Sequence, residues 1–253
     1  MEPVIFLIGG GWSAEHRDAV WGPFLRRARE RAEGGDPSIA CIVLDEGDGP
    51  DQVQRWAGVL GQTAVCTPVP VLVPEGAQAT DEQRAALAAA HGVLVCGGLT
   101  PAYADALWSS AALIRSLVAD GVPYAGFSAG SAVAAERALV GGWRHRGVPV
   151  CPEDAGEDLE EITVVDGLGL VPYALDVHAA QWGTLARLVA AVTGGLVEQG
   201  VALDEDTVLQ IAADGSATVT GAGRVHLVRR PGHGADGVRV TSFAAGRTVP
   251  AAP

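Results

Sequence analysis

Residues 123–135 read PYAGFSAGSAVAA, and this stretch decides the fold. Residues 124–127 are typical of a short buried strand, and the small residues 129–135 can form a helix. The letters GFSAG between them match G-x-S-x-G, in which glycines permit a sharp turn that lifts the serine hydroxyl out of the strand end. Ser128 is therefore the candidate nucleophile, and the first amides of the helix, from Ala129 on, would face a developing negative charge. For this motif alone, a turn without chemistry is the alternative.

Apolar runs separated by helix-compatible segments precede this stretch. Runs that are apolar on both faces and alternate with helices are typical of a parallel sheet covered by helices on both sides. The sequence therefore predicts a doubly wound α/β fold with a mostly parallel sheet. Strands are expected at residues 4–8, 39–44, 70–73, 93–96 and 124–127, and helices at residues 15–32, 52–60, 81–91 and 101–119.

Three unusual loops are expected at one rim of this sheet. The triple glycine at residues 9–11, the pair Gly97-Gly98 and Ser128 each follow one of the predicted strands. In doubly wound sheets, ligands bind beyond the carboxyl ends of the strands. The triple glycine lacks the G-x-G-x-x-G spacing, so no dinucleotide site is predicted. The rim is the expected place of the functional site.

The second half of the chain changes character. A helix is expected at residues 179–192, and a short strand at residues 201–207. Beyond them, β-favouring segments separated by turns predict antiparallel hairpins, at residues 217–220, 224–228 and 238–243. The tail, residues 249–253, is expected to fray. No internal repeat and no linker rich in proline and serine interrupts the chain, so residues 1–253 are expected to form one domain.

The composition argues against several functions. The 253 residues include 30 acidic and 17 basic ones, the basic ones all arginine, for a net charge of −13. Binding a phosphate backbone needs clustered positive charge, so a nucleic-acid partner is not expected. The N-terminus lacks the basic region of a signal peptide, and no apolar run approaches the roughly 18 residues of a membrane helix. We therefore expect a cytoplasmic protein with no membrane partner, and monomer and homodimer both remain open.

Metal and disulfide chemistry are not expected either. The four cysteines stand far apart and form no C-x-x-C pair, which argues against a zinc site and a disulfide framework. The acidic segment at residues 151–161, CPEDAGEDLEE, is expected to be solvated and mobile. Its alternative role is to attract an amine or guanidinium of a substrate.

A serine nucleophile needs a base, and the base needs a group that holds its tautomer. Among the six histidines, His178 stands out because it falls where an apolar segment ends and a helix is expected to begin. A histidine that only caps a helix is the alternative. For the orienting carboxylate, residues 204–206 are three consecutive acids at the end of an apolar strand, a costly arrangement unless it serves a purpose. A solvated turn is the alternative there.

The order of these features resembles the dipeptidase E and cyanophycinase family of serine peptidases. That family has a flavodoxin-like fold related to the class I glutamine amidotransferases. The resemblance spans residues 4 to about 228 and lies in GFSAGSA at 126–132, DGLGLVPYALDVH at 166–178, GVALDEDTVLQI at 200–211 and, more weakly, CGGLT at 96–100.

The resemblance implies a role for each matching residue. Ser128 would be the nucleophile, His178 the general base and then acid, and Glu205 the acid that orients His178. The backbone amides of Gly98 and Ala129 would form the oxyanion hole. This chemistry requires no metal or cofactor. Another branch of the family takes its acid from the segment after the serine, which makes Glu136 a second candidate.

The sequence departs from the cyanophycinases at the substrate side. In those enzymes Phe-x-x-Arg-x-Arg-x-x-Arg follows the histidine, whereas here only Arg187 remains, and Leu99 replaces the asparagine of a Gly-Gly-Asn loop. Leu99, Trp182 and Arg187 are the candidate substrate contacts. The departures argue against β-aspartyl-arginine cleavage. The expected substrate is a small peptide or amide, with an acidic N-terminal or β-aspartyl residue as the family-level expectation.

Three other functions are alternatives to this one. An α/β-hydrolase esterase would need an acid such as Asp204 or Asp214 followed by His226 or His233. A non-catalytic descendant could bind a peptide or amino acid at the same rim. A glutamine amidotransferase is disfavoured because it needs cysteine at the position of Ser128.

Overall fold

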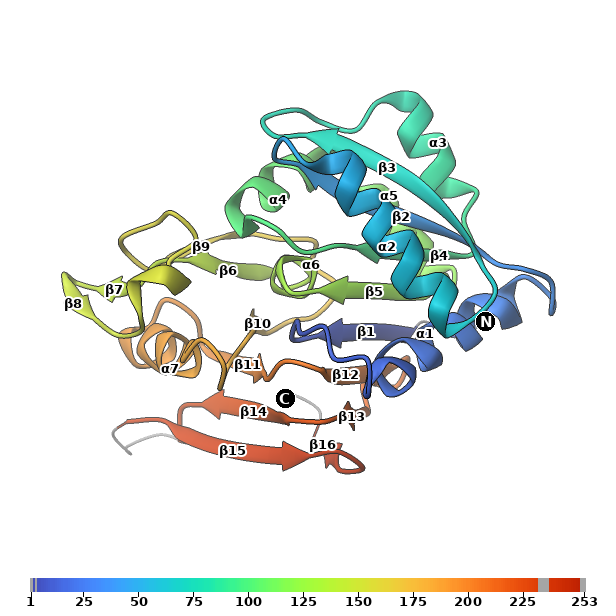
Figure 1. Ribbon diagram of the computed structural model, residues 1–253. Helices are drawn as coiled ribbons and strands as arrows, with labels where there is room; N and C mark the ends of the chain where they lie inside the picture. The colour runs from blue at the N-terminus through green and yellow to red at the C-terminus, as the bar shows by residue number, and fades with distance from the viewer. Residues whose placement is uncertain (1, 3, 232–236, 251–253) are drawn as a thin grey trace.

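The centre of the protein is a sheet of eight strands (Figure 1). The computed structural model describes residues 2, 4–231 and 237–250. Five neighbouring strands of the sheet run parallel, and three antiparallel ones continue it on one side. In spatial order they are β16 (Thr248–Val249), β13 (Ala217–Gly221), β12 (Thr207–Ala212), β1 (Val4–Ile8), β5 (Tyr124–Phe127), β4 (Gly92–Val95), β2 (Ser38–Asp45) and β3 (Thr67–Pro74).

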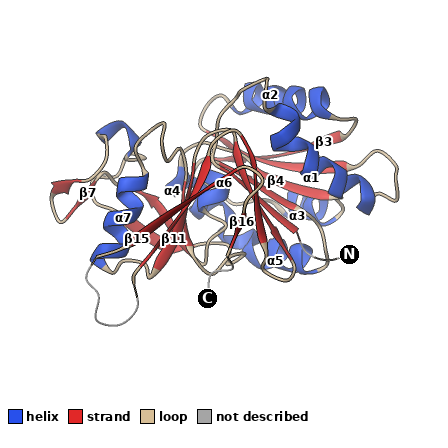
Figure 2. Cartoon of the chain, turned by 90° about the horizontal axis from the view of Figure 1, so that it is seen from below, coloured by secondary structure: helices blue, strands red, loops and turns tan. Residues whose placement is uncertain are grey.

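Helices cover both faces of this sheet, as Figure 2 shows for α1 and α2 on one side and α5 on the other. This arrangement confirms the doubly wound, mostly parallel α/β fold that the alternation of strands and helices predicted. The helices are α1 (Arg17–Arg31), α2 (Gly49–Thr63), α3 (Asp81–Ala88), α4 (Thr100–Leu107), α5 (Ala111–Ala119), α6 (Ala129–Ala132) and α7 (Leu185–Gly194), with 3-10 turns at Trp108–Ser110 and Glu153–Ala155.

A second sheet of four strands stands beside the first, with α7 packed against it (Figure 1). It contains β10 (Ala174–Asp176), β11 (Gln199–Leu203), β14 (Arg224–Arg229) and β15 (Arg239–Ala244). Two small pairs lie next to it: β6 (Arg137–Gly141) with β9 (Thr163–Asp166), and β7 (Arg144–His145) with β8 (Val148–Pro149). The predicted C-terminal hairpins are present as β12–β13 and β14–β15, but they belong to different sheets.

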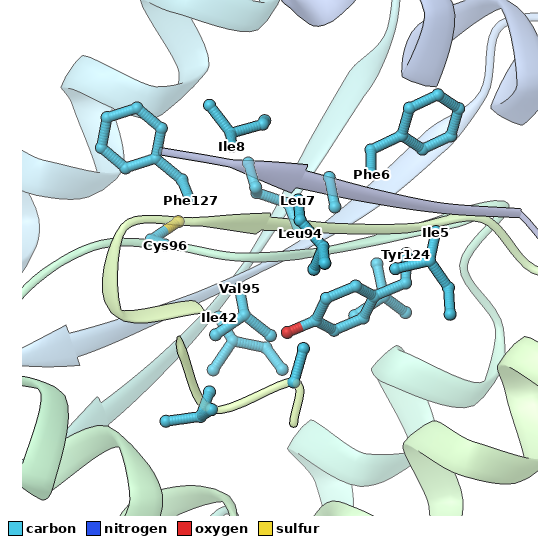
Figure 3. Packing of buried hydrophobic residues seen from close by; sticks show 14 of the residues in the cluster. Ile5, Phe6, Leu7, Ile8, Ile42, Leu94, Val95, Cys96, Tyr124 and Phe127 are labelled. Atoms are coloured by element: carbon cyan, nitrogen blue, oxygen red, sulfur yellow. The ribbon is translucent and has the colours of Figure 1, made fainter. Parts of the chain in front are cut away.

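The core is built from side chains on the two faces of the parallel strands. Figure 3 shows Phe6 and Ile8 on one side of β1 and Tyr124 and Val95 on the other. All four are buried. Because consecutive residues of a strand point to opposite faces, an uninterrupted apolar strand must be covered on both. The apolar runs seen in the sequence thus serve two packing layers at once.

Strand positions were predicted better than helix ends. The strands at residues 4–8 and 124–127 have the predicted limits, whereas the helix expected at 129–135 ends at Ala132. The helix expected at 179–192 begins only at Leu185. Gly183, with φ of 72°, and a turn closed by the Trp182 amide on the His178 carbonyl occupy its expected first part. Tertiary contacts, described below, override helical propensity there.

The first residue of the predicted tail, Val249, differs from the expectation of fraying. Val249 is buried in β16 and pairs with Ala217 of β13, because its apolar side chain closes the edge of the main sheet. Residues 251–253 of the predicted tail lie outside the described residues. Within the part of the chain that the structure describes, no helix has the length and apolar character needed to span a membrane.

One buried hydroxyl joins the strands behind the serine turn. Ser131 Oγ accepts a hydrogen bond from the Ile8 amide at 2.8 Å and lies 2.7 Å from the carbonyl oxygen of Gly126. We predict that Ser131→Ala lowers the free energy of unfolding by about 1–3 kcal/mol, because it removes the buried hydroxyl that contacts the amide and carbonyl of Ile8 and the carbonyl of Gly126. Urea denaturation measures this. Ser109→Ala, at an exposed serine, is the control and should change little; equal midpoints for both variants would contradict the prediction.

Candidate active site

Ser128 stands at the turn between β5 and α6 in a strained conformation. Its φ is 50° and its ψ −112°, a combination that residues other than glycine rarely adopt. The flanking glycines permit the turn by close approach: a Cβ at Gly126 would overlap the Gly130 carbonyl oxygen, and a Cβ at Gly130 would overlap that of Val95. The Ser128 amide donates to the Ile8 carbonyl at 3.0 Å. The turn is thus packed tightly enough to hold the serine in place.

His178 presents its ring to the serine. Its Nε2 lies 2.7 Å from Ser128 Oγ, and the ring is buried. The residue follows β10, has a φ of 56°, and its amide donates to the Gly9 carbonyl at 3.0 Å. The first glycine of the triple-glycine loop therefore anchors the backbone that carries the imidazole, and the loop lies at the rim where the sequence predicted a site.

Glu205 completes the row of contacts. Its Oε1 lies 2.7 Å from His178 Nδ1, on the side of the ring opposite the serine. The backbone amide of Glu205 donates to Gln181 Oε1 at 2.9 Å, which holds the start of the β11–β12 turn against the loop after His178. Glu136, the second candidate acid, is exposed and makes no contact with His178 among the described residues.

Burial lowers the pKa of His178, and the hydrogen bond to Glu205 raises it in partial opposition. Burial prevails, so the pKa lies below that of a free imidazole. The ring is consequently neutral near pH 7. A neutral imidazole whose Nδ1–H is bonded to a carboxylate leaves Nε2 free to accept a proton from the serine hydroxyl.

The serine and histidine face a cavity of about 720 Å³. Two backbone amides near it, those of Gly98 and Ala129, donate to no acceptor among the described residues. Gly98 follows β4 and Ala129 opens α6, so both stand at the carboxyl end of the parallel strands. They are the amides that the sequence resemblance assigned to an oxyanion hole.

Acidic side chains dominate the wall of this cavity. Among the described residues, six carboxylates line it, and besides His178 the one basic residue there is Arg55. Burial raises the pKa of the Glu46 and Glu157 carboxyls, and three of the remaining four are exposed and unpaired in the described residues. The cavity therefore keeps a negative potential at neutral pH. The six carboxylates belong to Glu46, Glu153, Asp154, Glu157, Asp158 and Glu160.

The acidic side chains of residues 151–161 are mostly exposed, as expected of a solvated segment, but hydrogen bonds tie the segment down where mobility was expected. Glu157 accepts a hydrogen bond from the Thr100 amide at 3.0 Å, and Arg187 Nη1 donates to the Ala155 carbonyl at 2.5 Å. The guanidinium of Arg187 also forms a two-pronged pair with the Asp176 carboxylate, at 2.9 and 2.7 Å. Main-chain contacts that a charge count does not reveal therefore fix this segment.

The three candidate substrate contacts separate in the structure. Leu99 and Trp182 line the cavity, while Arg187 does not and is only 4% exposed. The Leu99 amide donates to Glu46 Oε1 at 3.2 Å, which links the loop after β4 to the acidic wall. The structure thus places Arg187 behind the cavity, where it holds the acidic segment.

Sequence reasoning missed several residues of the site. Gln181 was not singled out, because a lone glutamine in a predicted helix carries no signal. Trp12, which follows the triple glycine, lines the cavity and packs on Phe127 with ring centroids 4.7 Å apart. Arg55 lies over the Trp12 ring at 3.6 Å. An exposed arginine on a helix has no sequence signature either.

His226 lies in a separate network. Its Nδ1 lies 2.7 Å from Ser242 Oγ and its Nε2 3.2 Å from Asp204 Oδ1. The histidine at Ser128 is therefore His178, and not the His226 that an esterase order would require. His233, the other histidine considered for that order, lies outside the described residues.

Residues 70–219, more than half of the chain, match peptidase family S51. The chain belongs to this family and is a peptidase, which confirms the resemblance to the dipeptidase E and cyanophycinase family.

Among its relatives is the cyanophycinase of Synechococcus elongatus, 29% identical over 237 residues, which are 89% of this chain and 67% of that protein. The cyanophycinase of Trichormus variabilis is 31% identical over 153 residues, 59% of this chain and 48% of the relative. The crystal structure of a peptidase from an acI-B1 actinobacterium superposes with a TM-score of 0.68 and 17% identity, over 98% of this chain and 97% of the other. That likeness shows the shared fold.

The buried Arg187–Asp176 pair has an exposed counterpart that makes a matched test. Removing one partner of a buried pair strands the other charge, so Arg187→Met should lower the free energy of unfolding by about 3–5 kcal/mol. Arg137→Met breaks the pair with Asp166, whose side chains are 56% and 66% exposed, and should cost less than about 1 kcal/mol. Urea denaturation compares the two; similar losses would contradict the assignment of Arg187 as the buried anchor.

Proposed function

We propose that this chain cleaves a peptide or amide bond through an acyl-enzyme, with Ser128 as nucleophile, His178 as general base and acid, and Glu205 as the carboxylate that orients His178. The observation that carries the proposal is the unbroken row of two 2.7 Å contacts from Ser128 Oγ through the imidazole to Glu205. Membership of peptidase family S51 supports it.

In the first half of the reaction, His178 Nε2 takes the proton of Ser128 Oγ as the oxygen attacks the substrate carbonyl. The carbonyl oxygen becomes an oxyanion, which the amides of Gly98 and Ala129 stabilise by hydrogen bonding. Glu205 keeps the proton on Nδ1 and stabilises the imidazolium. His178 then gives the Nε2 proton to the leaving amine, and the C–N bond breaks.

In the second half, water attacks the ester carbonyl of the acyl-enzyme. His178 accepts a proton from this water and returns it to Ser128 Oγ as the acyl group leaves as a carboxylic acid. The serine and histidine regain their starting protonation states. Every proton moves between the serine, the histidine, substrate and water, so these side chains and amides suffice for the cycle.

The charge of the cavity favours substrates with a cationic group. Carboxylates on the wall attract an ammonium or guanidinium and repel a carboxylate. This distribution speaks against the acidic N-terminal or β-aspartyl substrate expected from the family resemblance. We propose a short peptide or amide that carries a positive charge, with Leu99 and Trp182 as its apolar contacts.

The alternatives have less support. A binding protein without catalysis has no need of a strained serine with its hydroxyl 2.7 Å from a buried imidazole. We also propose a cytoplasmic location, since the four cysteines, all within the described residues, are unpaired.

Covalent labelling tests the nucleophile directly. A fluorophosphonate probe should label wild type at Ser128, seen by intact mass and peptide mapping. Ser128→Ala should lose all labelling, and His178→Ala should slow it by at least about a hundredfold, because an unassisted serine is a weak nucleophile. Ser109→Ala serves as the control and should label like wild type. Labelling that is independent of His178 would overturn the proposed roles.

A matched peptide series tests the charge preference. Fluorogenic peptides that differ only in one side chain, lysine, norleucine or aspartate, should be cleaved with kcat/KM falling in that order. A difference of about 1 kcal/mol per charge corresponds to roughly fivefold per step at low ionic strength, and salt should narrow it. An aspartyl peptide cleaved as fast as the lysyl one would refute the charge preference and leave the nucleophile assignment standing.

A further inference from the structure

A tryptophan lies flat on the ring of His178. The Trp182 and His178 rings are 3.9 Å apart between centroids and 8° from parallel. Trp182 is 41% exposed, whereas tryptophan is highly buried on average, so burial alone does not account for its position. The chain turns after His178 so that Trp182 lies over the imidazole, and the Trp182 amide closes this turn by donating to the His178 carbonyl at 2.8 Å. The side chain and the backbone of this residue both serve the histidine.

Gly10 confines the imidazole at another position. A Cβ at Gly10 would overlap His178 Cε1 and stand 2.7 Å from Nδ1 and 2.9 Å from Nε2. Both ring nitrogens are engaged, by Glu205 and by Ser128. Without Trp182, one whole face of the ring would lack a packing partner, and rotation toward the cavity would become possible.

The turn that carries Trp182 is itself held by the acids of the β11–β12 turn. The Ala180 amide donates to Asp204 Oδ1 at 3.1 Å, and Gln181 Oε1 accepts from the Glu205 amide at 2.9 Å. The same short turn therefore supports the imidazole through Trp182 and the orienting carboxylate through Gln181. A change at Trp182 leaves these backbone contacts in place.

The stacking has an electrostatic consequence during catalysis. When Nε2 accepts the serine proton, the ring becomes a cation, and the negative face of an indole attracts a cation by about 0.5–1 kcal/mol at partly exposed sites. Other charges that act on the ring come from Glu205 in the β11–β12 turn, Asp176 on β10 and Arg187 on α7. Asp204 and Asp206 flank Glu205 in the same turn, and Glu153 and Asp154 line the cavity that His178 faces. None of these is replaced when Trp182 changes.

We propose that Trp182 is a positioning residue for the catalytic histidine: its indole face holds the imidazole between Ser128 and Glu205 and stabilises the imidazolium that forms on proton transfer. The part of this inference that concerns catalysis, the holding of the imidazole for proton transfer from Ser128, rests on the proposed function. Its structural part, the stabilisation of protonated His178, holds independently of any substrate.

The kinetic test uses the fluorophosphonate probe, which needs no knowledge of the substrate. Trp182→Leu keeps an apolar cover but removes the π face, so the second-order labelling rate should fall about two- to fivefold at neutral pH. Loss of imidazolium stabilisation lowers the pKa of the ring, so the acid limb of the rate profile should move to lower pH by about half a unit. Trp182→Phe keeps a smaller π face and should lie between wild type and Trp182→Leu.

A second measurement does not depend on activity. In Ser128→Ala protein, the NMR signal of the His178 Cε1 proton, assigned by comparison with His178→Ala, reports the pKa directly. Adding Trp182→Leu should lower the titration midpoint by about half a pH unit. Trp108→Leu, at a tryptophan that is 67% exposed and far from this turn in the chain, is the matched control and should change neither the rate nor the midpoint.

The outcomes separate the two claims. Unchanged labelling and an unchanged midpoint in Trp182→Leu would overturn the role of Trp182, while wild-type labelling at Ser128 would still support the proposed function. Absence of labelling in wild type would overturn the proposed function. The NMR titration would still test whether Trp182 stabilises the protonated form of His178. If Trp182→Leu does not fold, as judged by its melting curve, Trp182→Met tests the same loss of the π face.

Discussion

The site depends on a close contact of backbone with backbone at the end of β5. Ser128 can hold its strained φ of 50° only because the chain on either side of it packs without side chains, Gly126 against Gly130 and Gly130 against Val95. The hydroxyl of Ser131 then fixes this turn to β1. Strain of the order of 1–3 kcal/mol persists where the surroundings over-determine a conformation. The large buried core of parallel strands provides that rigidity, and it holds the Ser128 hydroxyl in position at the turn.

Local pattern accounts for most of the parallel half of the fold. Strands such as β1 and β5 are short and apolar, and each follows a proline in the sequence, so local pattern places them. The antiparallel half depends on contacts between distant segments. The residues of β12 carry no local signal that this strand pairs with β1. They also do not indicate that β14, which follows the β12–β13 hairpin, joins the other sheet. Pairing over such distances is decided by competition among strands for the same edge, which no short window of sequence contains.

The candidate site divides in the same way. Ser128 was predictable from its motif, and His178 and Glu205 from their order along the chain combined with a family resemblance. Gln181 was not predictable, and Trp182 was predicted as a substrate contact but not as a partner that stacks on His178. The positions of both follow from the left-handed backbone conformation of His178 and from Gly183, which replace the expected helix by a turn. Helical propensity over this segment is high, yet it is overruled by hydrogen bonds to the acids at 204 and 205.

The burial of Arg187 against Asp176 shows how one buried ion pair can influence the charge of a neighbouring cavity. An arginine on the first turn of α7 could reach solvent or substrate, but the carboxylate of Asp176 on β10 draws it inward, where pairing offsets the cost of burying both charges. Its remaining donor holds the Ala155 carbonyl. The positive charge is thereby removed from the cavity, and the acidic segment is fixed along its wall. The Arg187–Asp176 pair thus makes the cavity more negative in two ways, by removing a positive charge and by fixing carboxylates along the wall. The negative potential near Ser128 therefore depends on packing as well as on composition.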